Sequence, residues 1–176
     1  MKKVLLLLFL CLFAMTKAQE AKPLGFTKVV EVPGVSKENL YNRAKLWVSD
    51  NFKKAEYVVD VDDKENGLII CKSNYLFESK SITGGDTARG RVTFTLKMFF
   101  KDGKYKYEIT DFVHSNKDFG LLTESDEPAR KKSFGKGWYQ KIWKEIKTDA
   151  KIKIAIITTD LEKGMKKQSE IEKDNW

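Results

Sequence analysis

Residues that could carry out nucleophilic or acid–base chemistry are few in this sequence. Hydrolysis or group transfer needs a base beside a nucleophile, or two carboxylates in one cleft. The single histidine, His114, falls at the end of an expected strand, where a surface or hairpin-end role is usual. Cys71 lies in an apolar strand without a basic neighbour that would activate its thiol, so we expect an inert core residue. The sequence therefore predicts no catalytic residues.

The acidic stretch at residues 60–66 resembles a calcium-binding loop at first sight. An EF-hand loop places oxygen ligands at positions one, three and five and a glycine at position six. Counted from Asp60, the fifth residue is Lys64 and the sixth is Glu65. The pattern fails, and we interpret the stretch as an acidic hairpin turn, with a weak extracellular-type calcium site as the alternative.

Two glycine pairs, Gly84-Gly85 and Gly135 with Gly137, are the remaining loop-like motifs. Neither has the spacing or the strand-to-helix context of a phosphate-binding loop, so both are expected to be turns. The sequence also has no cluster of cysteine and histidine. We predict no metal site and no cofactor.

Positive charge is concentrated at the C-terminal end of the chain. Residues 130–176 contain 13 Lys and Arg against 7 Asp and Glu, a net charge of +6. Lys144, Lys147 and Lys151 share one side of an expected helix, opposite Ile142 and Ile146, and Lys141 is a fourth candidate contact on the same helix. They form either an ordinary solvated surface or a contact for anionic lipid, acidic glycan or another acidic partner.

The N-terminal residues 1–18 have the features of a signal peptide. A basic start precedes an apolar run at residues 4–14 and a small-x-small cleavage site that ends at Ala18. We expect export to the periplasm or the cell exterior, where a protein meets little nucleic acid, so a nucleic-acid partner is disfavoured. A retained anchor and a lipoprotein at Cys11 are alternatives, disfavoured by the short run and by the place of Cys11 inside it. Cleavage leaves Cys71 unpaired, so no internal disulfide is expected.

A long antiparallel hairpin organises the chain between Arg91 and His114. Asp102-Gly103 suits a two-residue turn between the two strands. After Ile109 the apolar alternation changes phase at Phe112, which predicts a bulge near Thr110-Asp111. Apolar residues alternate on both strands of the hairpin: Val92, Phe94, Leu96, Met98, Phe100, Tyr105, Tyr107 and Ile109.

The rest of the chain supplies three more strands and two helices. The expected elements are a strand at 26–32, a helix after the N-cap Ser36 and ending near Phe52, strands at 55–61 and 68–77, and a long helix from Trp138 to Leu161. In the first helix we expect four residues on the solvated side: Lys37, Arg43, Lys45 and Asp50.

This order predicts an α+β fold, β-α-β-β-β-β-α, with two helices on one face of a five-stranded antiparallel sheet. We expect one domain at residues 19–166 and a polar C-terminal tail at 167–176, with fraying from Gly164 onward.

Two blocks of the sequence resemble a known family. The first comprises Glu31-Val32-Pro33-Gly34, Ser36-Lys37, Leu40-Tyr41, Arg43-Ala44 and Trp47, and the second comprises Val92, Phe94, Leu96, Lys101-Asp102-Gly103-Lys104-Tyr105 and Phe112. They are similar to exported Bacteroidetes domains of unknown function with a TBP-like fold, over about residues 26–114. The resemblance implies the fold just described and brings no activity or ligand, because a fold alone does not define a function.

Two strands carry apolar residues on both sides, although two helices can cover only one face of the sheet. Leu68 and Ile70 alternate with Ile69 and Cys71. The second face could be covered by residues 115–137, by a second copy of the chain or by a ligand. We therefore expect an exported, non-catalytic binding or protein-interaction module of the cell envelope, with an envelope enzyme whose site is not recognised as the alternative. The expected partners for the second sheet face are a second copy of the chain, which would give a homodimer, or an envelope protein.

Overall fold

The computed structural model describes residues 21–52, 54–80, 89–128, 135–168 and 172. The proposed signal peptide at 1–18 and Gly84-Gly85 lie outside these residues. The elements are β1 (Phe26–Glu31), α2 (Lys37–Asn51), α3 (Ala55–Val58), β2 (Val59–Asp63), β3 (Leu68–Glu78), β4 (Arg89–Lys101), β5 (Lys104–His114) and α4 (Lys136–Lys166). All strand pairs are antiparallel, in the spatial order β1-β5-β4-β3-β2. The predicted α+β fold with a five-stranded antiparallel sheet is confirmed.

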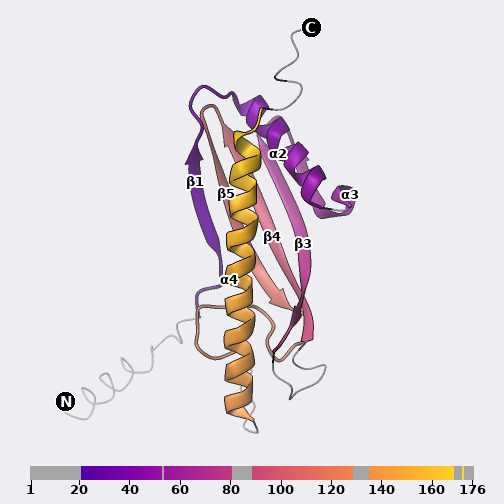
Figure 1. The fold of residues 1–176 in the computed structure, drawn as a ribbon, viewed down its shortest axis with the longest axis vertical. Helices are drawn as coiled ribbons and strands as arrows, with labels where there is room; N and C mark the ends of the chain where they lie inside the picture. The colour runs from indigo at the N-terminus through magenta and orange to yellow at the C-terminus, as the bar shows by residue number, and fades with distance from the viewer. Residues whose placement is uncertain (1–20, 53, 81–88, 129–134, 169–171, 173–176) are drawn as a thin grey trace, which may run out of the picture.

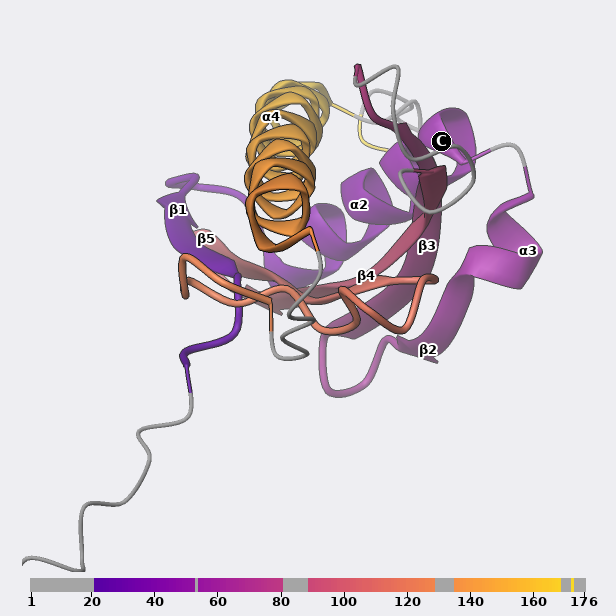
Figure 2. The ribbon, with the colours of Figure 1, turned by 90° about the horizontal axis from the view of Figure 1, so that it is seen from below.

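Helices α2 and α4 lie on the same side of the sheet, and the sheet curves around them (Figures 1 and 2). Helix α4 has 31 residues and α2 has 15, so their lengths are about 46 Å and about 22 Å. The longer helix runs along the whole sheet, whereas α2 covers only the end near the turn between β4 and β5, where the Lys37 amide donates to Asp102 at 2.7 Å.

The alternating residues of the β4–β5 hairpin form the centre of the core, as the sequence predicts. The hairpin turns at Gly103, whose φ of 73° is left-handed. Thr95 pairs with Thr110 and Thr93 pairs with Val113, so one residue of β4 faces two of β5. This is the predicted bulge, and Asp111 occupies it with a φ of 57°. The bulge keeps Phe112 and His114 on the helix side of the sheet, where both are buried.

Helix α2 begins as predicted, because the Ser36 hydroxyl accepts a hydrogen bond from the Asn39 amide at 3.2 Å. The expectation that Arg43 is solvated is wrong. Its side chain is only 6% exposed, donates to the Met165 carbonyl at 2.9 Å and forms an ion pair with Glu172. Arg43 is buried because the C-terminal end of α4 and Glu172 pack on this side of α2.

The predicted strand at residues 55–61 is partly wrong. Ala55 to Val58 form the short helix α3, and the strand β2 starts at Val59. Hydrogen bonds from the Tyr57 amide to the Lys54 carbonyl and from the Val59 amide to the Ala55 carbonyl close this single helical turn. Four residues are too few to show a helical period, so the alternation of larger apolar residues was a misleading signal.

Helix α4 extends beyond the predicted end at Leu161. The apolar stripe that the sequence predicts is buried at Ile142, Trp143, Ile146, Ala150, Ile154 and Leu161, and half-buried at Ile157; Thr158 and Met165 are buried as well. The predicted fraying from Gly164 is wrong, because Met165 is fully buried and Gly164 lies directly against Trp47.

The described part of the segment at 115–128 closes the end of the sheet that lies beside the start of α4. The Leu122 amide donates to the Phe112 carbonyl, and the Leu24 amide donates to the Leu122 carbonyl, both at 2.8 Å. The Phe119 ring contacts the rings of His114 and Trp143. Because these partners belong to the helix side of the sheet, Phe119 does not cover the opposite face.

Candidate functional site

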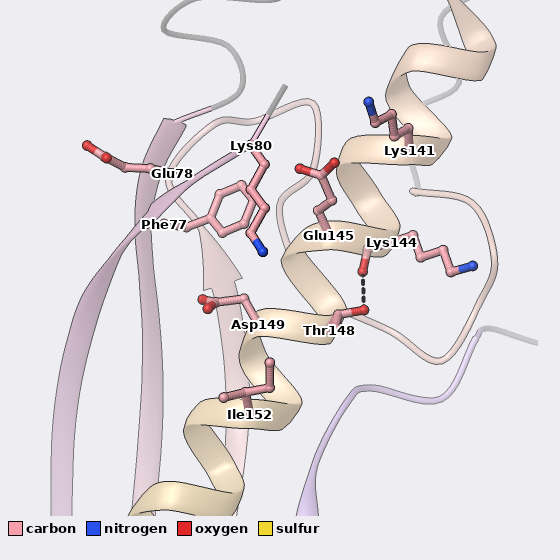
Figure 3. Close-up of a pocket in the computed structure, with 9 residues that line it drawn as sticks. All are labelled: Phe77, Glu78, Lys80, Lys141, Lys144, Glu145, Thr148, Asp149 and Ile152. Carbon is pink, nitrogen blue, oxygen red and sulfur yellow. Dashed lines mark hydrogen bonds between the residues drawn. The ribbon is translucent and has the colours of Figure 1, made fainter. Parts of the chain in front are cut away.

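A pocket of about 470 Å³ lies between the end of β3 and the N-terminal half of α4. We call it the β3–α4 pocket. It is lined by Phe77, Glu78, Lys80, Lys141, Lys144, Glu145, Thr148, Asp149 and Ile152 (Figure 3). The pocket exists because α2 packs at the other end of the sheet, so beside α4 no second described helix covers the end of β3.

The two sides of the pocket come from two regular elements. Phe77 is a helix-facing residue of β3. Its ring packs edge-on against the His114 ring, with 5.9 Å between the two ring centroids. On α4, residues at spacings of three and four share one face, which brings Glu145, Asp149 and Ile152 to the pocket. Ile152 is 52% exposed, so an apolar surface is open to an incoming molecule.

Asp149 gives the pocket its distinctive chemistry. Its Oδ2 atom is buried and has no hydrogen-bond partner, and the same is true of the Tyr75 hydroxyl. Burial raises the pKa of Tyr75, and the negative charge of Asp149 and a side-chain hydrogen-bond interaction with it raise the pKa further. The Tyr75 hydroxyl therefore lies near the Asp149 carboxylate, although the two atoms do not have the geometry of a full hydrogen bond. A buried acceptor without a donor costs about 1–3 kcal/mol. This carboxylate is therefore ready to accept a hydrogen bond from a bound molecule.

The other polar groups of the pocket already have partners. The Glu145 carboxylate accepts a hydrogen bond from the Ser79 hydroxyl. The Thr148 hydroxyl donates to the Lys144 carbonyl at 2.8 Å. Both hydroxyls are thus engaged with partners on α4.

The four predicted lysines are divided between two surroundings. Lys147 donates to the Ser125 carbonyl at 2.5 Å, and Lys151 forms an ion pair with Glu124 at 3.6 Å. Both lysines thus hold the segment before α4. Lys141 and Lys144 line the β3–α4 pocket and form no ion pair with the described part of the chain.

Cys71 is a core residue, as expected. The expectation of a surface position for His114 is wrong: the residue ends β5, but its side chain is only 1% exposed, because Phe77 and Phe119 pack against the ring. The His114 Nδ1 atom accepts a hydrogen bond from the Asn116 amide at 3.0 Å, its Nε2 atom has no partner, and burial lowers its pKa. Cys71 is fully buried, and burial raises the pKa of its thiol to about 12. The thiol is therefore neutral and shielded at physiological pH.

The acidic residues at 60–66 serve the hairpin. Asp63 accepts a hydrogen bond from the Asn66 amide at 2.9 Å, Asp62 accepts one from the Tyr41 hydroxyl, and Asp60 pairs with Lys72 at 2.9 Å. Among the residues that the structure describes, no group of three or more His, Cys, Asp or Glu is placed to hold a metal ion. The described helices also include none with the length and apolar character needed to cross a membrane.

We call the side of the sheet opposite the helices the open face. Its strands alternate polar residues with apolar ones, the latter including Val29, Leu68, Ile70, Leu76 and Phe99. The Lys106 ammonium lies 4.4 Å from the Phe99 ring centroid, and Leu76 is 63% exposed. The open face is therefore mixed in character, with separate apolar positions.

Sequence reasoning found the lysines at the edge of the pocket but missed Tyr75, Phe77, Asp149 and Ile152. Phe77 and Ile152 look like ordinary core or surface residues in the sequence. A stripe beside the buried one, Glu145-Asp149-Ile152, was the only available signal. This stripe lines a pocket only because α2 does not extend to this end of the sheet, and the spacing of residues in α4 does not show where α2 ends.

These features define a class of protein: an α+β domain in which two helices cover one face of a curved antiparallel sheet, with a small pocket beside the longer helix. The chain belongs to the family described as a domain of unknown function (DUF4468) with TBP-like fold, whose model matches residues 26–115. The family resemblance noted in the sequence is thereby confirmed.

Two solved structures share this fold. A DUF4468 family protein from Bacteroides ovatus aligns with a TM-score of 0.62 and 14% identity, over 84% of this chain and 89% of the other. A TBP-like protein from Parabacteroides distasonis aligns with a TM-score of 0.60 and 14% identity, over 84% of this chain and 95% of the other. No curated protein matches the chain. At this identity the two structures establish the fold alone.

Proposed function

We propose that this protein is a non-catalytic binding module of the cell envelope that takes a small amphipathic molecule into the β3–α4 pocket. The observation that carries the proposal is the buried Asp149 Oδ2 atom without a partner, next to an apolar surface. Ligand sites in proteins combine an apolar lining with a few polar groups that fix orientation, in volumes of about 300–1,000 Å³. The β3–α4 pocket has this composition and size.

The non-catalytic part of the proposal rests on how the reactive side chains are engaged. Cys71 and His114 are buried, and the hydroxyls of Ser79 and Thr148 donate to Glu145 and to a backbone carbonyl. An envelope enzyme remains the alternative. Its mark would be turnover of a bound molecule, which mass spectrometry of the ligand after incubation would detect.

The envelope location rests on residues 1–18. If they are a signal peptide, protein isolated from its native cells should begin at Gln19 and be found outside the cytoplasm. An intact mass that includes residues 1–18, or a cytoplasmic location, would contradict this part of the proposal.

Binding in the pocket can be tested with two tryptophan variants one helical turn apart. Ile152 lines the pocket and is 52% exposed, whereas Ile156 is 58% exposed and is not part of the lining. Small aryl-alkyl amines, alcohols and carboxylates are titrated while amide signals are followed by NMR. We expect shifts near Phe77, Thr148 and Ile152 that Ile152→Trp abolishes and Ile156→Trp preserves. Shifts spread evenly over the molecule, or equal in both variants, would contradict the proposal.

A second candidate function is contact with an anionic lipid or glycan through α4. It is supported by Lys141 and Lys144, which form no ion pair with the described residues, and weakened by the engagement of Lys147 and Lys151. Reversal of charge at Lys141 and Lys144 should weaken binding to acidic vesicles, and binding of the wild type should decrease with added salt. Absent or salt-independent binding of the wild type would rule this candidate out.

A further inference from the structure

We infer that the molecule bound in the β3–α4 pocket carries a protonated primary amine on an apolar body, with the ammonium group donating to Asp149. This inference rests on the proposed function and specifies its ligand class. It starts from the two buried oxygen atoms that have no partner, Asp149 Oδ2 and the Tyr75 hydroxyl.

An ammonium group matches these two atoms better than a neutral or anionic group does. It has three N–H donors and no acceptor, so it can donate to the carboxylate and to the phenol oxygen together. A ligand hydroxyl could donate to Asp149 but would bring no charge to the buried carboxylate. A carboxylate would be repelled by it. Hydrogen bonds between charged groups are also about twice as strong as neutral ones.

The charged side chains that line the pocket point in different directions. In Figure 3 the carboxylates of Glu145 and Asp149 lie on the side of α4 that faces β3, whereas the ammonium of Lys144 points away from that side and Glu78 points away from the helix. Lys80 extends from the end of β3 into the space between Phe77 and Asp149. Lys141 also lines the pocket, and its ammonium lies above Glu145 in Figure 3. Glu145 accepts a hydrogen bond from Ser79, so Asp149 is the carboxylate that a cationic ligand would meet.

The apolar body has its own surface. The Phe77 ring on β3 and the Ile152 side chain on α4 face the pocket from opposite sides (Figure 3). A phenyl or short alkyl group between them would cover the exposed part of Ile152, which stabilises the complex by removing apolar surface from water. A phenyl ring joined to an ammonium by two carbons is a suitable probe.

The test compares three probes of similar shape and different charge: 2-phenylethylamine, 2-phenylethanol and 3-phenylpropionate, each titrated by NMR at neutral pH. We expect the amine to bind most tightly. Asp149→Asn keeps the shape of the side chain and should weaken amine binding by about tenfold or more, while binding of the alcohol changes little. Glu78→Gln is the matched control, because this carboxylate lines the same pocket but points away, and it should leave the affinity for the amine unchanged.

Each outcome separates the inference from the proposed function. Equal binding of the three probes, or amine binding that Asp149→Asn does not weaken, overturns the amine inference and leaves the pocket as a binding site. If none of the three probes binds to the wild-type protein, both the amine inference and the proposed binding function are overturned. If Asp149→Asn does not fold, Lys80→Ala decides, because removal of the competing ammonium should strengthen amine binding several-fold, and an unchanged affinity overturns the inference.

Discussion

His114 shows how a single buried group can make stability depend on pH. Its ring lies between Phe77 and Phe119, and burial lowers its pKa below the ordinary value of 6.5. The unfolded chain therefore takes up a proton at a higher pH than the folded protein does. The stability contributed by neutral His114 is complete above pH 6.5 and is lost as the pH falls below this value toward the pKa of the folded state.

We expect the free energy of unfolding to decrease as the pH falls below 6.5, by up to about 1.4 kcal/mol per pH unit for one proton. Among the described carboxyl groups, those with a shifted pKa, such as Asp62 and Glu162, have values below 4.5, so they contribute at more acidic pH. His114→Phe keeps a ring between the same neighbours and should remove this slope. Urea denaturation at several pH values measures it, and a slope that persists in the variant would contradict the assignment.

At the scale of the element, the C-terminal end of α4 is fixed by its contact with α2. The Trp47 indole N–H donates to Asp160 at 2.9 Å, which holds the ring in place. A Cβ atom added at Gly164 would lie 2.6 Å from this ring. Gly164 thus allows the two helices to approach closely.

Gly164→Ala should destabilise the protein by about 1–3 kcal/mol, because the new methyl group forces Trp47 or α4 to shift. Gly137→Ala is the control in the same helix, since no atom lies within 4 Å of its added Cβ. It should be neutral or stabilise the protein by up to about 1 kcal/mol through helix propensity. Thermal denaturation compares the two, and equal melting temperatures would show that the contact is not tight.

The elements that the sequence predicts best are those in which buried residues recur with a regular period over a long stretch of the chain. The alternation in β4 and β5 and the stripe of α4 extend over more than ten residues each, so the period is clear, and even the bulge at Asp111 was visible as a change of phase. The helical turn at Ala55 is too short for a period. The burial of Arg43 depends on Glu172 and Met165, which are far away in sequence. The pocket depends on the relative lengths of α2 and α4, which only the assembled sheet defines.

At the scale of the whole molecule, the open face is the proposed contact for a second copy of the chain or for an envelope protein. Its apolar residues are separated by charged ones, so a partner would have to match both. Val29 and Leu76 are the most exposed apolar side chains among the described residues of this face. Such positions are typical of contacts that add small, separate apolar areas to a polar interface.

If a homodimer forms through this face, light scattering at micromolar concentration should report twice the mass of the chain. Leu76→Glu should then give a folded monomer. Tyr57→Glu changes a side chain that is 75% exposed on α3, outside the strands that form the open face, and should leave the dimer intact. A wild-type monomer would rule out the homodimer, and the open face would then have to serve another partner.

The position of α4 at the end of the chain sets the order in which the protein can be completed during synthesis. All five strands are finished by His114, yet the core of their helix side needs residues up to Met165. A nascent chain that has not reached α4 would expose the buried side of its sheet to water. We expect a fragment ending at residue 135 to aggregate, while addition of the α4 peptide should partly restore solubility. Folding of the sheet must then wait until α4 has been made.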